Sequence, residues 1–111
     1  MSVHQQLDQA VRRLEATLKA SDLWRVEEPS AEAMASQQPF CVDSMSLPQW
    51  LRFVFIARLD TMVAAQAALP ATCNVAPAAD LYLKQEQARA GDRLLVVKAI
   101  EEVDQVINEA P

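Results

Sequence analysis

Few side chains in this sequence have the types and spacing that catalysis or metal binding requires. The chain has a single histidine, His4, and two cysteines, Cys41 and Cys73. A closed zinc site needs several such ligands at short spacings, and a nucleophilic cysteine needs an adjacent base held by a third group. Because the histidine lies far from both cysteines in sequence, neither arrangement is predicted. We expect a solvated His4, reduced and inert thiols that are buried or half-buried, no metal, no cofactor and no enzymatic activity.

Phosphate chemistry and acid–base catalysis also find no support in the sequence. The chain has one glycine, Gly91, whereas a phosphate-binding loop needs residues without side chains so that backbone amides can approach the ligand. Adjacent acids occur as Glu27–Glu28 and Glu101–Glu102. Neighbouring residues on a helix point apart, so we interpret both pairs as solvated surface.

Arg58 is the polar residue that the hydrophobic pattern does not explain. On a helical projection at about 100° per residue, it falls in the middle of an apolar stripe. Burying an unpaired charge is prohibitive, so this arginine must reach solvent or find a partner. We predict a buried ion pair with Asp43, with Asp104 as the other candidate partner. The alternative is an arginine presented in a cleft to an anionic ligand or to the carboxylate of another protein.

Aromatic residues close to this arginine make residues 39–58 the most promising functional surface. Indole is a preferred anchor at interfaces, and Trp50 lies among Phe40, Phe53 and Phe55 in the sequence. Core packing is the other interpretation of these rings. The candidate binding residues are Pro39, Phe40, Asp43, Trp50, Phe53 and Arg58.

The elements that position these residues are predicted to be helices. The chain has 111 residues, 51% of them hydrophobic, which suits a single helical domain over residues 1–111. The scarcity of glycine disfavours a sheet protein, because turns and bulges between strands consume glycine. We therefore predict an all-α, four-helix bundle-like domain with a long ordered connector between the first and second helices.

The first and fourth helices follow from the spacing of their apolar residues. The first is predicted to have Ser2 and Gln5 as a capping box and to end near Ser21 and Asp22. The fourth runs from residue 92 to about residue 108. Its predicted buried residues are Val96, Ala99, Ile100, Val103, Val106 and Ile107.

The middle of the chain is less regular. We predict a short helix over residues 31–35 capped by Ser30, and an extended, ordered connector over residues 38–45. The second long helix begins at Ser46, with Gln49 in its capping box, and runs to about residue 69 before Pro70. It is apolar nearly all round, which indicates a central helix or an interface.

The third helix is predicted from Pro77 to about Ala90. Its apolar contacts would come from Leu81, Tyr82 and Leu83. Gly91 ends it in a left-handed conformation, which glycine adopts without steric cost.

Charge and hydropathy exclude some classes of partner. The net charge is −5, with the acidic excess in residues 22–46 and 70–111, and such a balance repels a nucleic-acid backbone. Direct nucleic-acid binding is therefore disfavoured, unless the fold gathers a local basic patch. No uncharged apolar run reaches the roughly 18–20 residues of a membrane span, and no secretory signal is visible. We expect no membrane partner and a cytoplasmic location.

Four stretches of this sequence form a recognisable pattern: LWRVEEPS at residues 23–30, SQQPFCVDSM at 36–45, QWLRFVFIARL at 49–59 and LPATCNVAP at 69–77. They resemble the YqcC-like family of small bacterial proteins. The resemblance covers nearly the whole chain. The family pattern reads Trp-Leu-Gln-Trp and Ile-Pro-Arg-Met in the third stretch, from which this chain departs at Arg52, Phe53, Ala57 and Leu59.

The resemblance implies an α-helical bundle of uncharacterised function, often encoded beside a tRNA pseudouridine synthase. We interpret the chain as a non-catalytic interaction or adaptor module that presents residues 39–58 to a protein partner, for which a tRNA-modifying enzyme is the named candidate. Self-association through the second helix is a variant of this interpretation. The alternative is a small-molecule binding domain with a pocket near Arg58, Asp43 and Trp50, and an enzyme using the same groups comes third.

Overall fold

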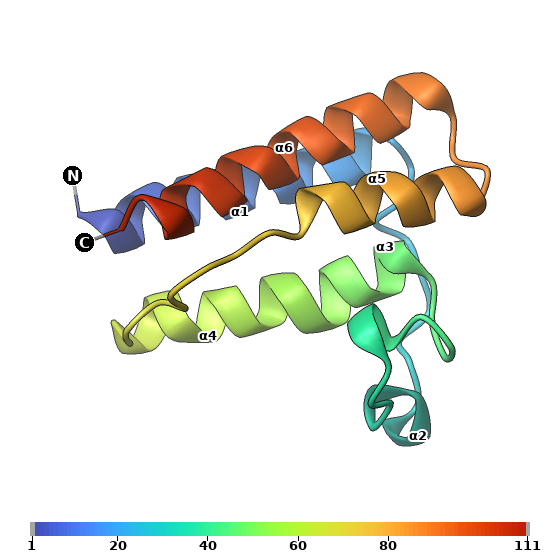
Figure 1. Ribbon diagram of the computed structural model, residues 1–111, viewed down its shortest axis with the longest axis horizontal. Helices are drawn as coiled ribbons and strands as arrows, with labels where there is room; N and C mark the ends of the chain where they lie inside the picture. The colour runs from blue at the N-terminus through green and yellow to red at the C-terminus, as the bar shows by residue number, and fades with distance from the viewer. Residues whose placement is uncertain (1, 111) are drawn as a thin grey trace.

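Four helical rods and one short helix make up the computed structural model, which describes residues 2–110. In Figure 1, α1 (Val3–Ala20) runs alongside α6 (Ala90–Asn108) in the opposite direction, and the first turn of α1 lies at the same end of the molecule as the last turn of α6. The rod that ends in α4 lies below this pair, and α5 lies between them. No strand occurs in residues 2–110, so the predicted all-α architecture is confirmed.

The first helix begins at the predicted capping box. The Ser2 hydroxyl accepts a hydrogen bond from the Gln5 backbone N–H at 3.1 Å, and the Gln5 side-chain oxygen accepts one from the Ser2 N–H at 3.0 Å. The helix ends close to the predicted position, where Asp22 turns the chain with φ 59°. Its apolar face packs against α6 and α4. The buried residues of that face are Leu7, Ala10, Val11, Leu14 and Leu18.

The connector between the first two rods is folded. Its short helix, α2 (Ala31–Met34), is capped by Ser30 as predicted. The prediction of an extended segment over residues 38–45 is wrong, because a 3₁₀ turn, η1 (Pro39–Cys41), folds the chain back on itself there. The turn buries Cys41 and brings Phe40 against the core, which an extended chain would leave in water.

The second rod starts as predicted but contains a π-helical segment. Ser46 and Gln49 form the expected capping box at the start of α3 (Leu47–Trp50). The rod continues as the π-helical segment η2 (Leu51–Ile56) and then as α4 (Ala57–Ala65). A π turn is rare and its hydrogen bonds span one residue more than those of an α-helix.

The π turn changes which side chains face the core after it. One extra residue in the turn rotates all later side chains by about 100° relative to a continuous α-helix. Leu59 therefore takes the buried place predicted for Arg58, with 3% of its surface exposed, while Arg58 faces solvent. Ile56 is buried as well, at 3% exposure. The predicted position of Arg58 inside the apolar stripe is thus wrong.

The second rod also ends earlier than the predicted residue 69. Gln66 adopts a left-handed conformation with φ 51°, and the N–H of Ala67 donates to the carbonyl of Met62 at 3.0 Å. This is the bonding of a left-handed helix cap. It redirects the chain before Pro70 is reached.

In the turn before α6, the left-handed conformation is adopted by a different residue from the predicted glycine. The third rod, α5 (Ala76–Gln85), ends five residues short of Ala90, and Gln87 takes the left-handed conformation with φ 62°. Gly91 instead lies in the first turn of α6. The side chain of Gln87 lies in solvent, so the cap uses an ordinary residue where glycine was expected.

The core lies where the four rods meet. Leu83 of α5 is buried as predicted, whereas Leu81 is 52% exposed and does not make the predicted core contact. The fourth rod buries Val96, Ile100, Val103 and Ile107, with Ala99 and Val106 half-buried. Within the part of the chain that the structure describes, no helix has the length and apolarity needed to span a membrane.

Candidate functional site

A groove opens beside Arg58, between the second rod and the connector that leads to α5. We call it the Arg58 groove, and its volume is about 300 Å³. Of the six predicted binding residues, Phe40, Trp50 and Arg58 line it. The full lining is Phe40, Trp50, Phe55, Arg58, Leu59, Met62, Pro70, Thr72, Cys73, Asn74, Val75 and Ile107.

Stacked aromatic rings form one wall of the Arg58 groove. Trp50 lies almost parallel to Phe55, with ring centroids 5.3 Å apart and an interplanar angle of 16°. Phe40 meets Trp50 edge to face at 4.8 Å and Tyr82 at 5.6 Å. Offset-stacked and edge-to-face pairs are the favourable aromatic geometries, so this wall is held in one arrangement.

Phe40 reaches this wall through an unfavourable backbone conformation. Its φ is 58° and that of Cys41 is 50°, a region that costs a residue with a side chain about 1–3 kcal/mol. The turn is kept by the Cys41 N–H, which donates to the carbonyl of Gln38 at 3.0 Å. The ring contacts to Trp50 and Tyr82 are the packing that offsets the strain.

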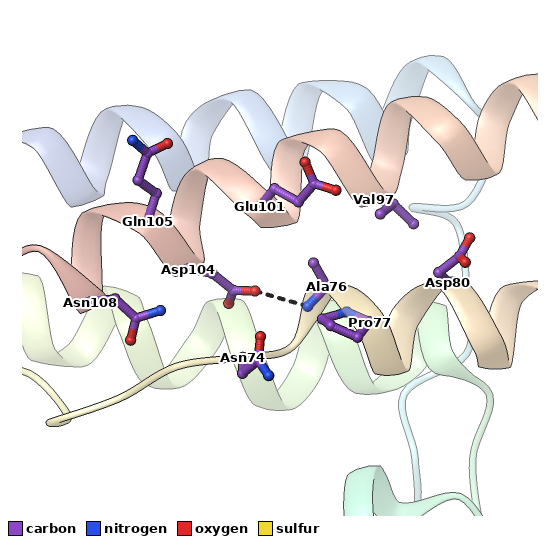
Figure 2. A pocket seen from close by; sticks show the side chains of 9 residues that line it. All are labelled: Asn74, Ala76, Pro77, Asp80, Val97, Glu101, Asp104, Gln105 and Asn108. Atoms are coloured by element: carbon purple, nitrogen blue, oxygen red, sulfur yellow. Dashed lines mark hydrogen bonds between the residues drawn. The ribbon is translucent and has the colours of Figure 1, made fainter.

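Asp104 of α6 holds the opposite wall in place. Its carboxylate is 6% exposed and accepts hydrogen bonds from the N–H groups of Val75 at 3.1 Å and Ala76 at 2.9 Å. Figure 2 shows this side chain pointing from α6 to the first residue of α5. The first N–H groups of a helix lack partners within the helix and favour a negative charge. Asp104 therefore caps α5 from a different helix.

Cys73 is fixed by the same helix. Its N–H donates to Asn108 Oδ1 at 2.8 Å, and Asn108 Nδ2 donates to the Cys73 carbonyl at 2.7 Å. The thiol donates to Asp104 at 3.1 Å. Burial, followed by the hydrogen bond to Asp104 and the charge of that carboxylate, raises the pKa of Cys73 to about 12. The thiol is therefore protonated and weakly nucleophilic at neutral pH.

Asn74 also lines a second hollow, whose side chains are drawn in Figure 2. Its carboxylates include Asp104, which caps α5, and Asp80, which pairs with Arg93 at 3.3 Å. These acids join α5 to α6. The hollow is lined by Asn74, Ala76, Pro77, Asp80, Val97, Glu101, Asp104, Gln105 and Asn108.

Arg58 has no carboxylate partner within residues 2–110. The predicted ion pair with Asp43 is wrong, because Asp43 accepts a hydrogen bond from Ser36 Oγ at 2.5 Å within the folded connector. The other candidate, Asp104, is occupied by the start of α5. With no Asp or Glu among the residues that line the groove, Arg58 is its one ionised side chain.

The remaining predicted site residues lie outside the groove. Pro39 and Asp43 are exposed in the connector. Phe53 is half-buried beneath the guanidinium group of Arg52, which lies 4.9 Å from its ring centroid and 4.5 Å from that of Trp24. The rings of Phe53 and Trp24 are thus held by Arg52 and do not line the groove.

The prediction of a solvated His4 is also wrong. Its Nε2 donates to the carbonyl of Ala67 at 2.7 Å, and the residue is half-buried. The contact joins the first turn of α1 to the end of the second rod. The predicted burial of the two cysteines is confirmed, since Cys41 is buried and Cys73 is half-buried, and both are free thiols.

Sequence reasoning missed the wall that residues 70–76 form. The segment lies between Pro70 and Pro77, and this proline-bounded corner was the available signal that it is ordered. Phe55 was named among the aromatic residues near Trp50 but left out of the site, because the π turn that stacks it on Trp50 has no clear sequence signature.

Comparisons with known proteins place these features in a family. The family model DUF446, described as "tRNA pseudouridine synthase C", matches residues 6–106. An uncharacterised protein of Haemophilus influenzae is 34% identical over 80 residues, which cover 72% of this chain and 76% of that protein. The uncharacterised protein YqcC of Escherichia coli is 30% identical, with 94% of this chain and 93% of that protein covered.

A larger protein also contains a related segment. The tRNA pseudouridine synthase C of Pectobacterium carotovorum subsp. carotovorum is 36% identical over 70 residues, which are 63% of this chain but 19% of that protein.

The fold agrees with a solved relative. The solution NMR structure of YqcC from E. coli matches with a TM-score of 0.84 and 28% identity, over 100% of this chain and 92% of that one. The matching segments, the family model and the shared helical architecture lead to one assignment. This chain belongs to the YqcC-like family of small helical bacterial proteins.

Proposed function

We propose that this chain is a non-catalytic module that docks on a tRNA pseudouridine synthase C. The observation that carries the proposal is the Pectobacterium relative. In it, a segment similar to most of this chain forms 19% of a protein named for that enzyme. In the E. coli relative, the same family of sequence accounts for 93% of the chain.

In one relative this segment is covalently joined to the enzyme, and in another it makes up nearly the whole chain. We expect the segment to contact the enzyme in both cases. Covalent linkage holds two parts at an effective concentration that reaches the millimolar range for short linkers. Without a linker, a docking surface must supply the affinity. The proposal therefore requires such a surface on this chain.

The Arg58 groove is the surface best suited to this role. Tryptophan and arginine are enriched among the residues that dominate binding energy at interfaces. The groove combines Arg58 with the half-buried rings of Trp50 and Phe40. Its walls are held by the ring contacts and by the cap from Asp104, so little ordering of the groove is needed when a partner binds.

The chemistry of the groove supports a role without catalysis. Catalysis by Cys73 would need a thiolate, but burial and Asp104 raise the pKa of this thiol to about 12. His4 bonds to the carbonyl of Ala67, outside the groove. In the proposed complex, the synthase contributes the chemistry and the contact with RNA, since a chain of net charge −5 is poorly suited to bind phosphates.

The docking proposal is tested by co-expressing this chain with the tRNA pseudouridine synthase C of the same organism. Affinity purification through a tag on the synthase should recover both proteins, and they should elute together in size-exclusion chromatography. A pseudouridine synthase of a different family serves as the specificity control. Separate elution of the two proteins at micromolar concentrations would contradict the proposal.

A second candidate function is the binding of a small aromatic or aliphatic carboxylate. It is favoured by the concave shape of the groove and by its single cation. Such a ligand would bind the purified chain in the absence of the synthase. Calorimetric titration with a panel of such acids distinguishes this function from docking.

A further inference from the structure

We infer that the Arg58 groove receives a segment of the synthase in which an apolar side chain stands next to a carboxylate. The inference rests on the proposed docking function and names the chemistry by which the groove recognises its partner. The apolar side chain lies against Trp50 and Phe55, and the carboxylate lies on Arg58.

The charge of the groove selects an acidic partner. Arg58 is exposed, and no carboxylate within residues 2–110 pairs with it. Cys73 is neutral because burial and Asp104 raise the pKa of its thiol. A guanidinium group offers a planar fork of donors that matches a carboxylate, and here that fork is available.

Two other arginines at the second rod make contacts within the fold. Arg52 donates to the carbonyl of Trp24 at 2.6 Å, and Arg12 contacts Asp8, Glu15 and Asp60. Arg12 and Arg52 are thus engaged within the fold. Arg58, displaced from the core by the π turn, is directed to solvent at the edge of an apolar groove.

The apolar walls of the groove favour a partner segment in which an apolar side chain lies next to the carboxylate. Phe55 and Leu59 form the floor, at 7% and 3% exposure, and the half-buried Trp50 and Met62 rise beside them. A side chain inserted here removes apolar surface from water on both partners. The volume of about 300 Å³ admits one large side chain and its backbone rather than a whole helix.

A nucleic-acid phosphate suits the groove less well than a protein carboxylate. Affinity for a phosphate backbone comes from several cations that each neutralise a phosphate. The groove has one cation among aromatic and aliphatic walls. We therefore assign the groove to a protein segment.

The inference is tested with short overlapping peptides that cover the synthase sequence, titrated against the full chain carrying Trp24→Phe. The chain has two tryptophans, so this variant leaves Trp50 as the fluorescent reporter inside the groove. We expect a peptide with an apolar residue beside Asp or Glu to change the Trp50 emission. Its Asn or Gln counterpart should bind about tenfold more weakly.

The arginine is tested in the same titration. Arg58→Ala should bind the acidic peptide and its amide counterpart equally well. Arg58→Glu should prefer a peptide whose acid is changed to Lys. Arg25→Glu, a charge reversal at an exposed arginine outside the groove, should bind like the parent chain. Circular dichroism and thermal unfolding confirm that each variant is folded.

The outcomes separate this inference from the docking proposal. If the intact synthase binds but Arg58→Glu does not weaken it, the recognition chemistry is wrong and docking stands. If the synthase does not bind, both fail. The inference is also overturned if free small carboxylates change the Trp50 emission as strongly as any peptide, or if sedimentation shows that a second copy of the chain fills the groove.

Discussion

The indole of Trp50 lies parallel to the ring of Phe55, five positions later, at a centroid distance of 5.3 Å and an angle of 16°. In a regular α-helix, side chains five residues apart are separated by about 140° around the axis. The π-helical segment η2 (Leu51–Ile56) brings them onto one face. The same extra residue buries Leu59 and turns Arg58 outward. One irregularity in the backbone thus builds the aromatic wall and exposes the cation beside it.

The stacking predicts unequal effects of the two phenylalanines of η2. Phe55→Ala removes a side chain that is 7% exposed and should lower the free energy of unfolding by about 3 kcal/mol. Phe53→Ala, on a half-buried residue outside the groove, should cost less than about 2 kcal/mol. Urea unfolding gives both values. Trp50 emission in the folded protein should shift for Phe55→Ala, and a shift confined to Phe53→Ala would contradict the stacked arrangement.

Asp104 is predicted to stabilise the fold as the cap of α5. Asp104→Asn should lower the free energy of unfolding by about 2 kcal/mol. The amide is neutral and has a single acceptor oxygen for the three groups that donate to the carboxylate. The matched control is Asp80→Asn, whose partly exposed pair with Arg93 is worth at most about 1 kcal/mol. Equal losses for the two variants in chemical unfolding would rule out the capping role.

The raised pKa of Cys73 predicts a loss of folding stability at alkaline pH. The folded state raises the pKa of this thiol from 9.0 to about 12, so the folded chain binds its proton more tightly than the unfolded chain. The stabilisation is fully present below pH 9 and is lost as the pH rises toward 12. Cys73→Ser keeps a donor for Asp104 and does not titrate. Thermal unfolding across this range should therefore show a steeper decline for the wild type, and parallel curves would refute the assignment.

The left-handed cap of α5 predicts a stabilising substitution. Gln87 is exposed and has φ 62°, a conformation that glycine adopts without a clash of its side chain. Gln87→Gly should raise the free energy of unfolding by roughly 0.5–1 kcal/mol. Gln85→Gly, two residues earlier and helical, should lower it by about 1 kcal/mol. A stability loss of the same size for both variants would mean that Gln87 is not the cap.

The sequence predicts those parts of the fold whose cause is local. Ser2 with Gln5 and Ser46 with Gln49 form the capping boxes that their spacing indicates. The apolar periodicity of α1 also identifies its buried face, because that helix is regular from end to end. Trp50 was chosen for its residue type and Arg58 for its place in the projected apolar stripe, and both line the groove.

The parts that could not be predicted depend on tertiary contacts. No local pattern marks the π turn, and the projection of Arg58 fails because it assumes one uniform helix. Asp104 caps a helix that lies 28 residues away in sequence, so its role is visible only when α5 and α6 are packed. Gly91 was expected to be the cap of α5, but the left-handed position falls on Gln87.

The affinity of the synthase for this chain tests the central claim most directly. Isothermal titration calorimetry would compare the tRNA pseudouridine synthase C of the same organism against the wild type, Arg58→Glu and Arg25→Glu. The account predicts a complex with the wild type and Arg25→Glu, and binding at least about tenfold weaker for Arg58→Glu. Equal affinity for all three chains would contradict the role of Arg58, and failure of the wild type to bind would contradict docking itself.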